Sequence, residues 1–334
     1  MSPIKLEIQR FGYDPFLDFL KGICIILIIL NHCIPSELRY QIYFPLWGSP
    51  AVPVFLIIQV FHFYKKGLNT TKPDYNKIWK RVVRPFIIVE LIIIAVLFYK
   101  ESSNNTIPSL KEMVYMLTGG PGSYYPWIYV QFAILLPLFR PIVKLQRVYI
   151  LIAFILLSQF AEIVCALSAM PEWIYRLTLF RYVFLVYLGC LLATKGYDVN
   201  SNTMMLSLVS VASATLFTYT DMDFNPIFYN VGAWSTCHWI CYFYIAFVMM
   251  TGLKMTFSYL DNYAFSALIK QIGKYSYEIY LFQLLYFTCV SEYVIYELSL
   301  TNKTIITIIV STLLCIIPVL LYKRIKERLK KEQL

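Results

Sequence analysis

The chain has little charge for its length. Only 14% of its 334 residues are charged, 59% are hydrophobic, and the mean hydropathy is +0.63. A water-soluble protein of this length needs a far larger share of charged residues. The 24 phenylalanines and 28 tyrosines exclude an intrinsically disordered chain, and apolar runs much longer than barrel strands exclude a transmembrane β-barrel. The composition therefore predicts an all-α fold, a polytopic bundle of transmembrane helices.

The eight cysteines form no CxxC pair, and nearly all of them lie inside apolar runs. We interpret them as small packing residues that a lipid environment tolerates. Only Cys237, His238 and Cys241, within one helical turn, suggest a metal. Three candidate ligands without an acidic or further histidine neighbour are too few for a tetrahedral site. We therefore expect no metal.

Ten apolar segments are long enough to cross a bilayer, because a spanning helix needs about 20 apolar residues. They are approximately residues 16–34, 46–64, 82–99, 126–143, 148–170, 177–194, 203–219, 227–251, 275–296 and 304–322. No repeat or low-complexity linker divides them. Residues 16–322 are therefore predicted to form one membrane domain, with short tails at residues 1–15 and 323–334.

The basic residues are distributed unevenly around these segments. Of the 29 lysines and arginines, 22 fall in tails and loops on the side of the N-terminus and five on the other side. The remaining two, Lys21 and Arg181, fall within spans. The positive-inside rule then predicts that both termini are cytoplasmic. The net charge of +10 is explained by this topology, so the expected partner is the lipid bilayer and not nucleic acid.

The first span contains two ionisable residues, Lys21 and His32, and such residues are costly inside a membrane. Asp18, three positions before Lys21, can form a local ion pair with it. Eleven residues of α-helix bring His32 back to within about 20° of the same face, roughly 16.5 Å further along the axis. An imidazole in that position could take a proton from a hydroxyl group. The alternative is an interfacial histidine with a snorkelling lysine.

Three motifs, in order along the chain, carry a resemblance to a known family. The stretch LDFLKGICIILIILNH, residues 17–32, is similar to the opening helix of the acyltransferase-3 family, in which Leu-Asp precedes a basic residue and a histidine follows ten residues later. KRVVRPF matches the family's Arg-x-x-Arg with Arg81 and Arg84, and IGKYSYEIYLFQ, residues 272–283, resembles its late Gly-x-x-Ser-Tyr segment. Gln283 stands where many members have histidine, and the QVF sequence at 59–61 replaces a frequent Ser-Gly-Phe.

The resemblance implies a bacterial inner-membrane, multi-pass O-acyltransferase. Members usually transfer an acetyl group from cytoplasmic acetyl-CoA to a hydroxyl group of an extracytoplasmic glycan, such as a surface polysaccharide or its precursor. His32 would then be the catalytic general base, with a transient acyl carrier as the alternative role, and Lys21 would share its helix face. Acyl-CoA would be a substrate, so no permanently bound cofactor is expected.

Two predicted sets of residues could bind the substrates. Arg81 and Arg84, about one helical turn apart, could hold the phosphates of the CoA donor, although ordinary positive-inside charge also explains them. On the acceptor side the candidates are Tyr125, Trp127, Glu162 and Arg181. The two aromatic residues could stack on sugar rings or belong to an interfacial belt, and the two charged residues could contact substrate or form a structural ion pair.

Other polar residues in the predicted spans leave the choice of function open. Glu90 could line a cavity, and Glu278 and Gln283 could serve either a donor channel or helix packing. A transporter or flippase of a glycan precursor, with Lys21, Glu162 and Arg181 as pathway charges, is the alternative from another class. A non-catalytic scaffold is a third possibility.

Overall fold

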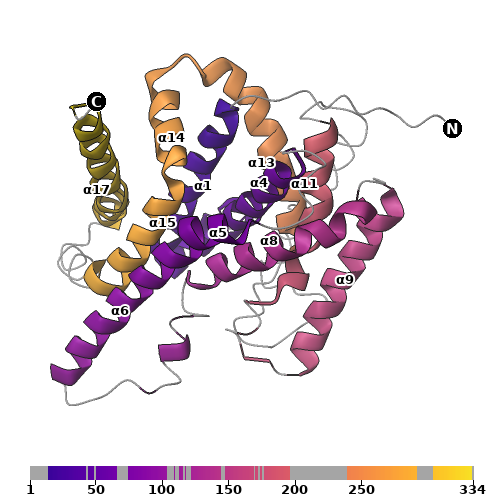
Figure 1. The fold of residues 1–334 in the computed structure, drawn as a ribbon, viewed down its shortest axis with the longest axis horizontal. Helices are drawn as coiled ribbons and strands as arrows, with labels where there is room; N and C mark the ends of the chain where they lie inside the picture. The colour runs from indigo at the N-terminus through magenta and orange to yellow at the C-terminus, as the bar shows by residue number, and fades with distance from the viewer. Residues whose placement is uncertain are drawn as a thin grey trace.

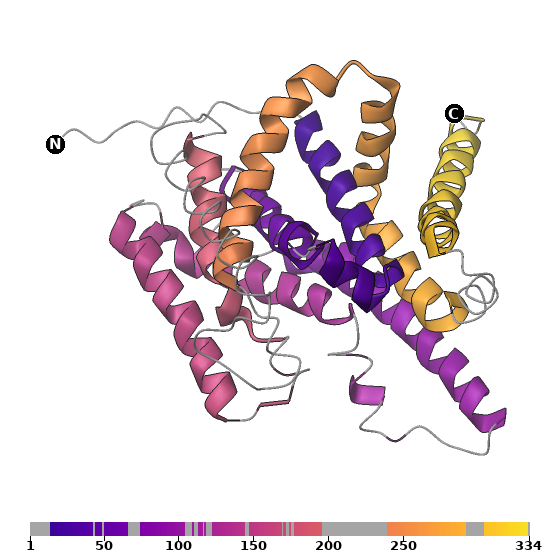
Figure 2. The same cartoon turned by 180° about the vertical axis from the view of Figure 1, so that it is seen from behind.

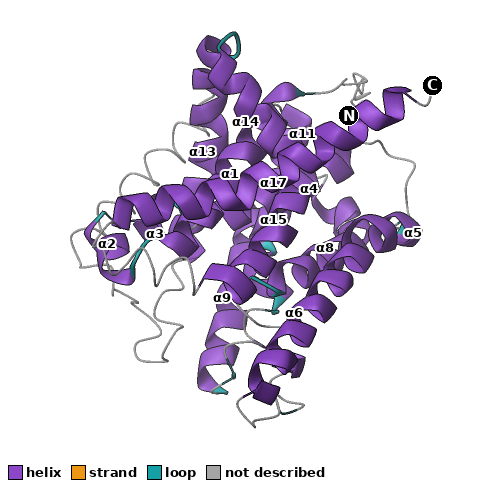
Figure 3. Ribbon diagram, turned by 90° about the vertical axis from the view of Figure 1, so that its left-hand side faces the viewer, coloured by secondary structure: helices purple, strands orange, loops and turns teal. Residues whose placement is uncertain are grey.

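The computed structural model describes residues 14–42, 44–48, 50–65, 74–103, 109, 113–115, 117, 122–143, 147–168, 170–171, 174, 177–195, 239–291 and 304–332. Within these ranges every regular element is helical and no strand occurs (Figure 3). In chain order the elements are α1 (Pro15–Cys33), α2 (Ser36–Gln41), α3 (Phe44–Trp47), α4 (Ala51–Lys65), α5 (Tyr75–Ile78), the π-helical η1 (Trp79–Val83), α6 (Arg84–Ser103), α8 (Tyr124–Val143), α9 (Val148–Leu167), the 3₁₀-helical η2 (Leu179–Tyr182), α11 (Phe184–Lys195), α13 (Trp239–Leu260), α14 (Ala264–Lys274), α15 (Ser276–Leu285), the π-helical η4 (Tyr286–Val290) and α17 (Thr304–Glu332). The predicted all-α class is confirmed.

Helix α1 lies inside the bundle and packs against α4, α13, α14, α15 and α17 (Figure 1). In its most apolar window 61% of the residues are buried, compared with 17% in Tyr75–Lys100 and 28% in Ile305–Leu329. The outer helices instead expose large apolar side chains, among them Leu91 on α6, Phe160 on α9 and Leu321 on α17. Apolar outer faces of this kind suit contact with lipid chains.

One end of the bundle is rich in lysine. The start of α1, the turn between α13 and α14, and the end of α17 all lie at the top in Figures 1 and 2. We call this the basic end, after its ion-paired lysines, among them Lys254, Lys270, Lys274 and Lys323. The sequence argument places the basic end in the cytoplasm.

The start and end of α1 follow from local sequence. The Asp14 carboxylate accepts a hydrogen bond from the backbone N–H of Phe16 at 3.1 Å, and Pro15 occupies the first turn, where its missing N–H costs nothing. At the other end Ile34 is extended, as expected for a residue before a proline. The helix therefore holds Lys21 and His32 on one continuous axis.

A π-helical turn interrupts the long helix made by α5, η1 and α6. Arg84 directly follows η1, and the next residue is Pro85. Proline has no N–H, and in a regular α-helix its ring would clash with the carbonyl group four residues back, that of Arg81. The backbone N–H of Arg84 bonds to the carbonyl group of Trp79, five residues back, and the ladder is widened just before the proline. Arg81 therefore lies in a π-helical turn and Arg84 at the start of α6, so the pair is still about one helical turn apart but does not lie on one continuous α-helix.

The predicted span at 275–296 corresponds to a broken helix that begins earlier. The structure has α14 from Ala264 and α15 from Ser276, separated by Tyr275, whose φ and ψ are −109° and 19°. Four helices are long and apolar enough to cross a membrane, and three shorter apolar helices accompany them among the described residues. The predicted segment 203–219 and the first part of 227–251 lie outside those residues. Ten spans and the side of the termini therefore stay predictions.

Candidate functional site

The basic end of α1 carries the predicted local ion pair. The Lys21 ammonium nitrogen is 2.5 Å from Asp18 Oδ1, and the two side chains are 23% and 10% exposed. A spacing of three residues places both on neighbouring turns of the helix, where such pairs form. The local pairing of Lys21 with Asp18 is confirmed, and it lowers the cost of keeping a lysine in an apolar helix.

Two glycines bring α14 into backbone contact with this part of α1. A Cβ atom at Gly273 would overlap the carbonyl oxygen of Asp18, and one at Gly22 would overlap the carbonyl oxygen of Ile269. Small residues at helix crossings allow this close approach in membrane proteins. The Gly273 of the IGKYSYEIYLFQ motif is therefore packed on the turn that carries Asp18 and Lys21, although the two motifs are about 250 residues apart in the sequence.

His32 lies in the last turn of α1 and is exposed. Its ring faces Phe287, with centroids 5.2 Å apart and planes inclined by 40°. Phe287 belongs to η4, the second π-helical turn among the described elements, so each π turn is next to a predicted site residue. The structure places Lys21 and His32 near opposite ends of α1 and does not bring them together.

A buried polar network that the sequence did not predict joins α6, the turn before α8, and α15. Ser123 Oγ donates to Glu90 Oε1 at 2.8 Å, and the Tyr280 hydroxyl donates to the carbonyl oxygen of Gly122 at 2.6 Å. Gly122 has a φ of +91°, which favours glycine, and a Cβ atom there would clash with Leu284. The turn before α8 is thus tied to both α6 and α15. Glu90 could be recognised as an intramembrane charge, but its partner is 33 positions away.

Four tyrosines line the contact between α8 and α15. Ring centroids are 5.6 Å apart for Tyr125 and Tyr280, 6.5 Å for Tyr125 and Tyr129, and 5.9 Å for Tyr277 and Tyr280. The Tyr277 hydroxyl donates to the carbonyl oxygen of Val82 at 2.7 Å, in the same π turn that carries Arg81. These tyrosines therefore connect the π turn with the network around Gly122.

Two buried carboxamides border this group of tyrosines. Gln59 Nε2 donates to the carbonyl oxygen of Tyr129 at 2.8 Å, while Gln59 Oε1 is buried and has no hydrogen-bond partner among the described residues. Gln283 is 1% exposed, and its Oε1 likewise lacks a partner within the described part of the chain. Both glutamines occupy positions where the sequence departs from the family pattern.

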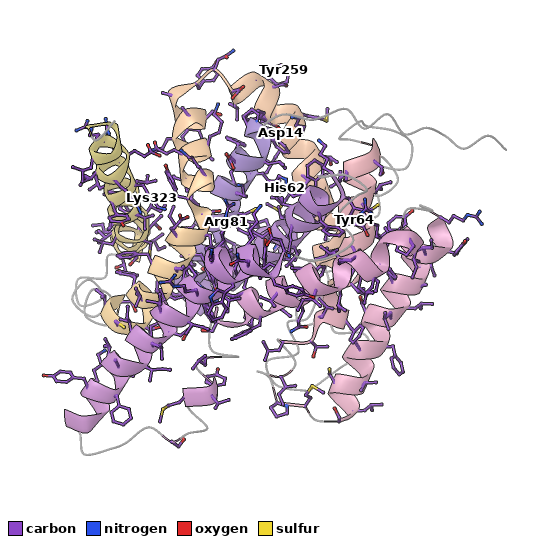
Figure 4. All side chains as sticks on the ribbon, in the orientation of Figure 1. Asp14, His62, Tyr64, Arg81, Tyr259 and Lys323 are labelled. Atoms are coloured by element: carbon purple, nitrogen blue, oxygen red, sulfur yellow. The ribbon has the colours of Figure 1, made fainter. Side chains whose placement is uncertain are left out.

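The predicted donor-binding arginines are exposed; Arg81 lies in the π turn and Arg84 directly after it. Figure 4 shows Arg81 in the middle of the bundle, whereas Lys323 lies on the outer helix α17. The Tyr277 hydroxyl donates to the carbonyl oxygen of Val82, the residue after Arg81. Arg81 is thus the member of the pair whose turn is bonded to the group of tyrosines.

The predicted acceptor residues Tyr125 and Trp127 lie in helix α8. Helix α8 begins at Tyr124, two residues before the predicted span at 126–143, with Pro126 in its first turn. The Trp127 indole N–H donates to the carbonyl oxygen of Leu117 at 2.9 Å, and its ring packs edge-on against Phe86. The proline at 126 is compatible with a helix because the first turn needs no N–H from it.

The other predicted acceptor residues belong to neighbouring elements. Helix α9, with Glu162, contacts η2, with Arg181, and Ser158 Oγ donates to the carbonyl oxygen of Phe180 at 2.8 Å. The side chains of Glu162 and Arg181 lie outside the part of the chain that the structure describes. Both the ion pair and the substrate contact stay predictions.

An interlocked group of charges joins α14 and α15 to α17 at the basic end. Glu327 accepts hydrogen bonds from the Tyr275 hydroxyl at 2.5 Å and from Lys274 at 3.3 Å, and Lys323 pairs with Glu278. The Tyr275 hydroxyl and the Glu327 carboxylate, as hydrogen-bonding neighbours of Lys274, raise the pKa of Lys274 above its ordinary value. Glu278 therefore has a structural partner, which favours helix packing for this residue.

Within the described ranges no group of three histidine, cysteine or acidic side chains gathers in a way that could hold a metal ion. Residues Cys237 and His238, and the side chain of Cys241, lie outside those ranges. The absence of a metal site stays a prediction.

Comparison with protein families identifies the class of protein. The acyltransferase-3 family model, described as an acyltransferase domain, matches residues 14–323, nearly the whole chain. The chain belongs to this family, and with its long apolar helices it is a membrane acyltransferase. No curated protein and no solved structure matches it.

Proposed function

We propose that this protein transfers an acyl group, acetyl in the first instance, from cytoplasmic acyl-CoA to a hydroxyl group of an extracytoplasmic saccharide in the bacterial inner membrane. The saccharide is a surface polysaccharide or its precursor. The observation that carries the proposal is the family match over residues 14–323, combined with one helix that has an ion-paired lysine near one end and an exposed imidazole at the other.

In this proposal His32 is the general base. Its exposed imidazole takes the proton of the acceptor hydroxyl as that oxygen attacks the thioester carbonyl carbon, and the CoA thiolate leaves. An acyl-histidine intermediate would need a second transfer step, so general-base catalysis requires fewer assumptions. Lys21 shares the helix face and lies about 16.5 Å towards the basic end.

The donor comes from the side of the basic end, and Arg81 and Arg84, at the π turn, bind its phosphates. The hydrogen bond from the Tyr277 hydroxyl to the carbonyl oxygen of Val82 supports this direction, because it connects the π turn that carries Arg81 with polar groups inside the bundle. Glu162 and Arg181 contact the acceptor sugar, and the rings of Tyr125 and Trp127 are the stacking candidates.

Comparison of surface glycans from cells with and without the protein tests the function. We expect one acetyl mass increment per modified sugar in the first sample, its absence in the second, and its absence again in cells with the His32→Ala variant. Unchanged acylation together with loss of surface glycan would instead support a transporter or flippase.

Labelling with a membrane-impermeant thiol reagent tests the orientation. Ser258, on α13 near the basic end, and Ser109, between α6 and α8, are both exposed. A cysteine at 109 should react from outside the cell, and a cysteine at 258 only after the membrane is opened. Ser123, just before α8, is unsuitable as a labelling position because it is 6% exposed and bonded to Glu90. Reaction at 258 in intact cells would place the arginines away from cytoplasmic CoA and refute the proposed direction.

A further inference from the structure

Two carboxamide oxygens, Gln59 Oε1 and Gln283 Oε1, are buried acceptors with no hydrogen-bond donor among the described residues. A buried acceptor without a donor costs free energy, and most buried polar atoms in folded proteins have a partner. The cost is greater inside a membrane, where no bulk water replaces the missing donor. Gln59 nevertheless positions its amide by donating Nε2 to the carbonyl oxygen of Tyr129. Its Oε1 is therefore held in a defined direction with the acceptor unused.

A series of side-chain and backbone contacts runs from the turn of Arg81, the predicted donor site, to His32, the predicted base. The two glutamines lie one after the other in this series. Gln59 is bonded to the backbone carbonyl of Tyr129, whose ring belongs to the group of tyrosines that is bonded through Tyr277 to the π turn of Arg81. Gln283 follows Tyr280 by about one turn of α15 and precedes Phe287, which contacts His32, by about 6 Å along the axis. Tyr125, which packs against both Tyr129 and Tyr280, lies between the two glutamines in this series.

A single ligand that satisfies both oxygens must carry two N–H or O–H donors. The pantetheine arm of acyl-CoA has this chemistry, because two secondary amides are separated by short methylene segments, with phosphates at one end and the thioester at the other. A fatty acyl chain has no donors, and a sugar ring has hydroxyl groups that would need several further polar partners.

We infer that Gln59 and Gln283 accept hydrogen bonds from the two amide N–H groups of the pantetheine arm, Gln59 from the amide nearer the phosphates and Gln283 from the amide nearer the thioester. This inference rests on the proposed function, because it takes acyl-CoA as the donor. The two glutamines then fix the depth to which the arm enters and hold the thioester near His32.

Amide-to-ester analogues of acetyl-CoA test the inference on the unaltered protein. In each analogue one amide N–H is replaced by an oxygen atom, which removes the donor and keeps the shape of the arm. Binding to purified protein in lipid nanodiscs is measured by calorimetry. Loss of one hydrogen bond at a buried acceptor should weaken the binding of either analogue by roughly three- to tenfold relative to acetyl-CoA.

Leucine variants assign each amide to its glutamine. Gln283→Leu should bind acetyl-CoA more weakly and should no longer distinguish it from the analogue altered at the amide nearer the thioester, while still distinguishing the other analogue. Gln59→Leu should show the reverse pattern. Gln131→Leu is the matched control, because Gln131, on α8, donates its Nε2 to a backbone carbonyl oxygen as Gln59 does, but to that of Leu177, and this variant should distinguish both analogues as the unaltered protein does.

The outcomes separate this inference from the proposed function. Acetyl-CoA that binds and supports acyl transfer, with both ester analogues binding equally well, would overturn the role of the glutamines alone. Discrimination that persists unchanged in Gln283→Leu and Gln59→Leu would do the same. Failure of the unaltered protein to bind acetyl-CoA would overturn the inference together with the proposed donor. Because Gln59→Leu also removes the bond to Tyr129, the analogue series on the unaltered protein is decisive if that variant does not fold.

Discussion

The two ends of helix α1 differ in how their ionisable residues are held. At the basic end Lys21 is paired with Asp18, and the backbone of α14 presses on the same turn through Gly273. At the other end His32 is exposed, and its ring faces the Phe287 ring 5.2 Å away. One helix thus carries a closely packed charged turn and an accessible imidazole.

This difference has a physical reason. A charge in an apolar helix must be compensated where it stands, so Lys21 requires a carboxylate and dense packing that excludes alternative positions. A neutral imidazole has no such requirement, and a general base must be reachable by the group it deprotonates. The packed end fixes the axis of α1, and the open end presents the reactive group.

The largest effect should come from the open end. His32→Ala should reduce acyl transfer by about 10²- to 10⁴-fold, because it removes the positioned base. Its unfolding temperature in detergent should stay close to that of the unaltered protein, since an exposed side chain is lost. Transfer is measured with radiolabelled acetyl-CoA in membrane vesicles with the protein at equal abundance. Near-normal transfer would end the assignment of His32.

A substitution at the packed end should change the stability of the fold. Gly273→Ala should destabilise the fold by about 1–3 kcal/mol, because its new Cβ atom overlaps the Asp18 carbonyl oxygen and α14 must move. Gly252 provides a matched control on α13, since a Cβ atom there meets nothing within 4 Å. Gly252→Ala should be neutral or up to about 1 kcal/mol more stable. Equal responses of the two variants, measured by chemical unfolding in detergent, would contradict the close crossing of α1 and α14.

Local features of the sequence predicted α1 well. Its boundaries agree with the apolar run at 16–34 to within one residue, and the Asp18–Lys21 pair needs only the spacing of one helix. The early start of α14 at Ala264 was missed for a related reason. Lys270 and Lys274 lower the hydropathy of that segment, so a search for apolar runs begins the span only after them.

Contacts distant in sequence could not be predicted. The hydrogen bonds of Ser123 with Glu90 and of Tyr280 with Gly122 form only when three separate segments pack together. No local pattern in a single sequence indicates such pairs. The geometry of Arg81 and Arg84 is different, because a local signal was present. Pro85 directly after the pair indicates a disturbed hydrogen-bond ladder, and the π turn follows from it.

Lys21 has a structural role as the partner of Asp18 and a proposed role in catalysis, and two variants separate these roles. Lys21→Met should destabilise the protein by about 1–3 kcal/mol, because Asp18 loses its cation in a largely buried position. The double variant Asp18→Asn with Lys21→Met should regain most of that stability. If Lys21 also acts in catalysis, transfer stays low in the double variant. Recovery of transfer in parallel with stability would restrict Lys21 to a structural role.

The smallest effect is expected for the ion pair that joins α15 to α17. Glu278, whose side chain is 41% exposed, pairs with Lys323 at the surface of the basic end, whereas Asp18 is 10% exposed. Water competes for exposed charges, so Glu278→Gln should cost less than about 1 kcal/mol. That cost should decrease further at high salt, since screening weakens exposed pairs. Both quantities are measured by chemical unfolding at two salt concentrations. A salt-independent loss as large as that of Lys21→Met would mean that the α17 contact is as dry and as closely packed as the turn of α1, and that the contrast in packing does not extend to the outer helix.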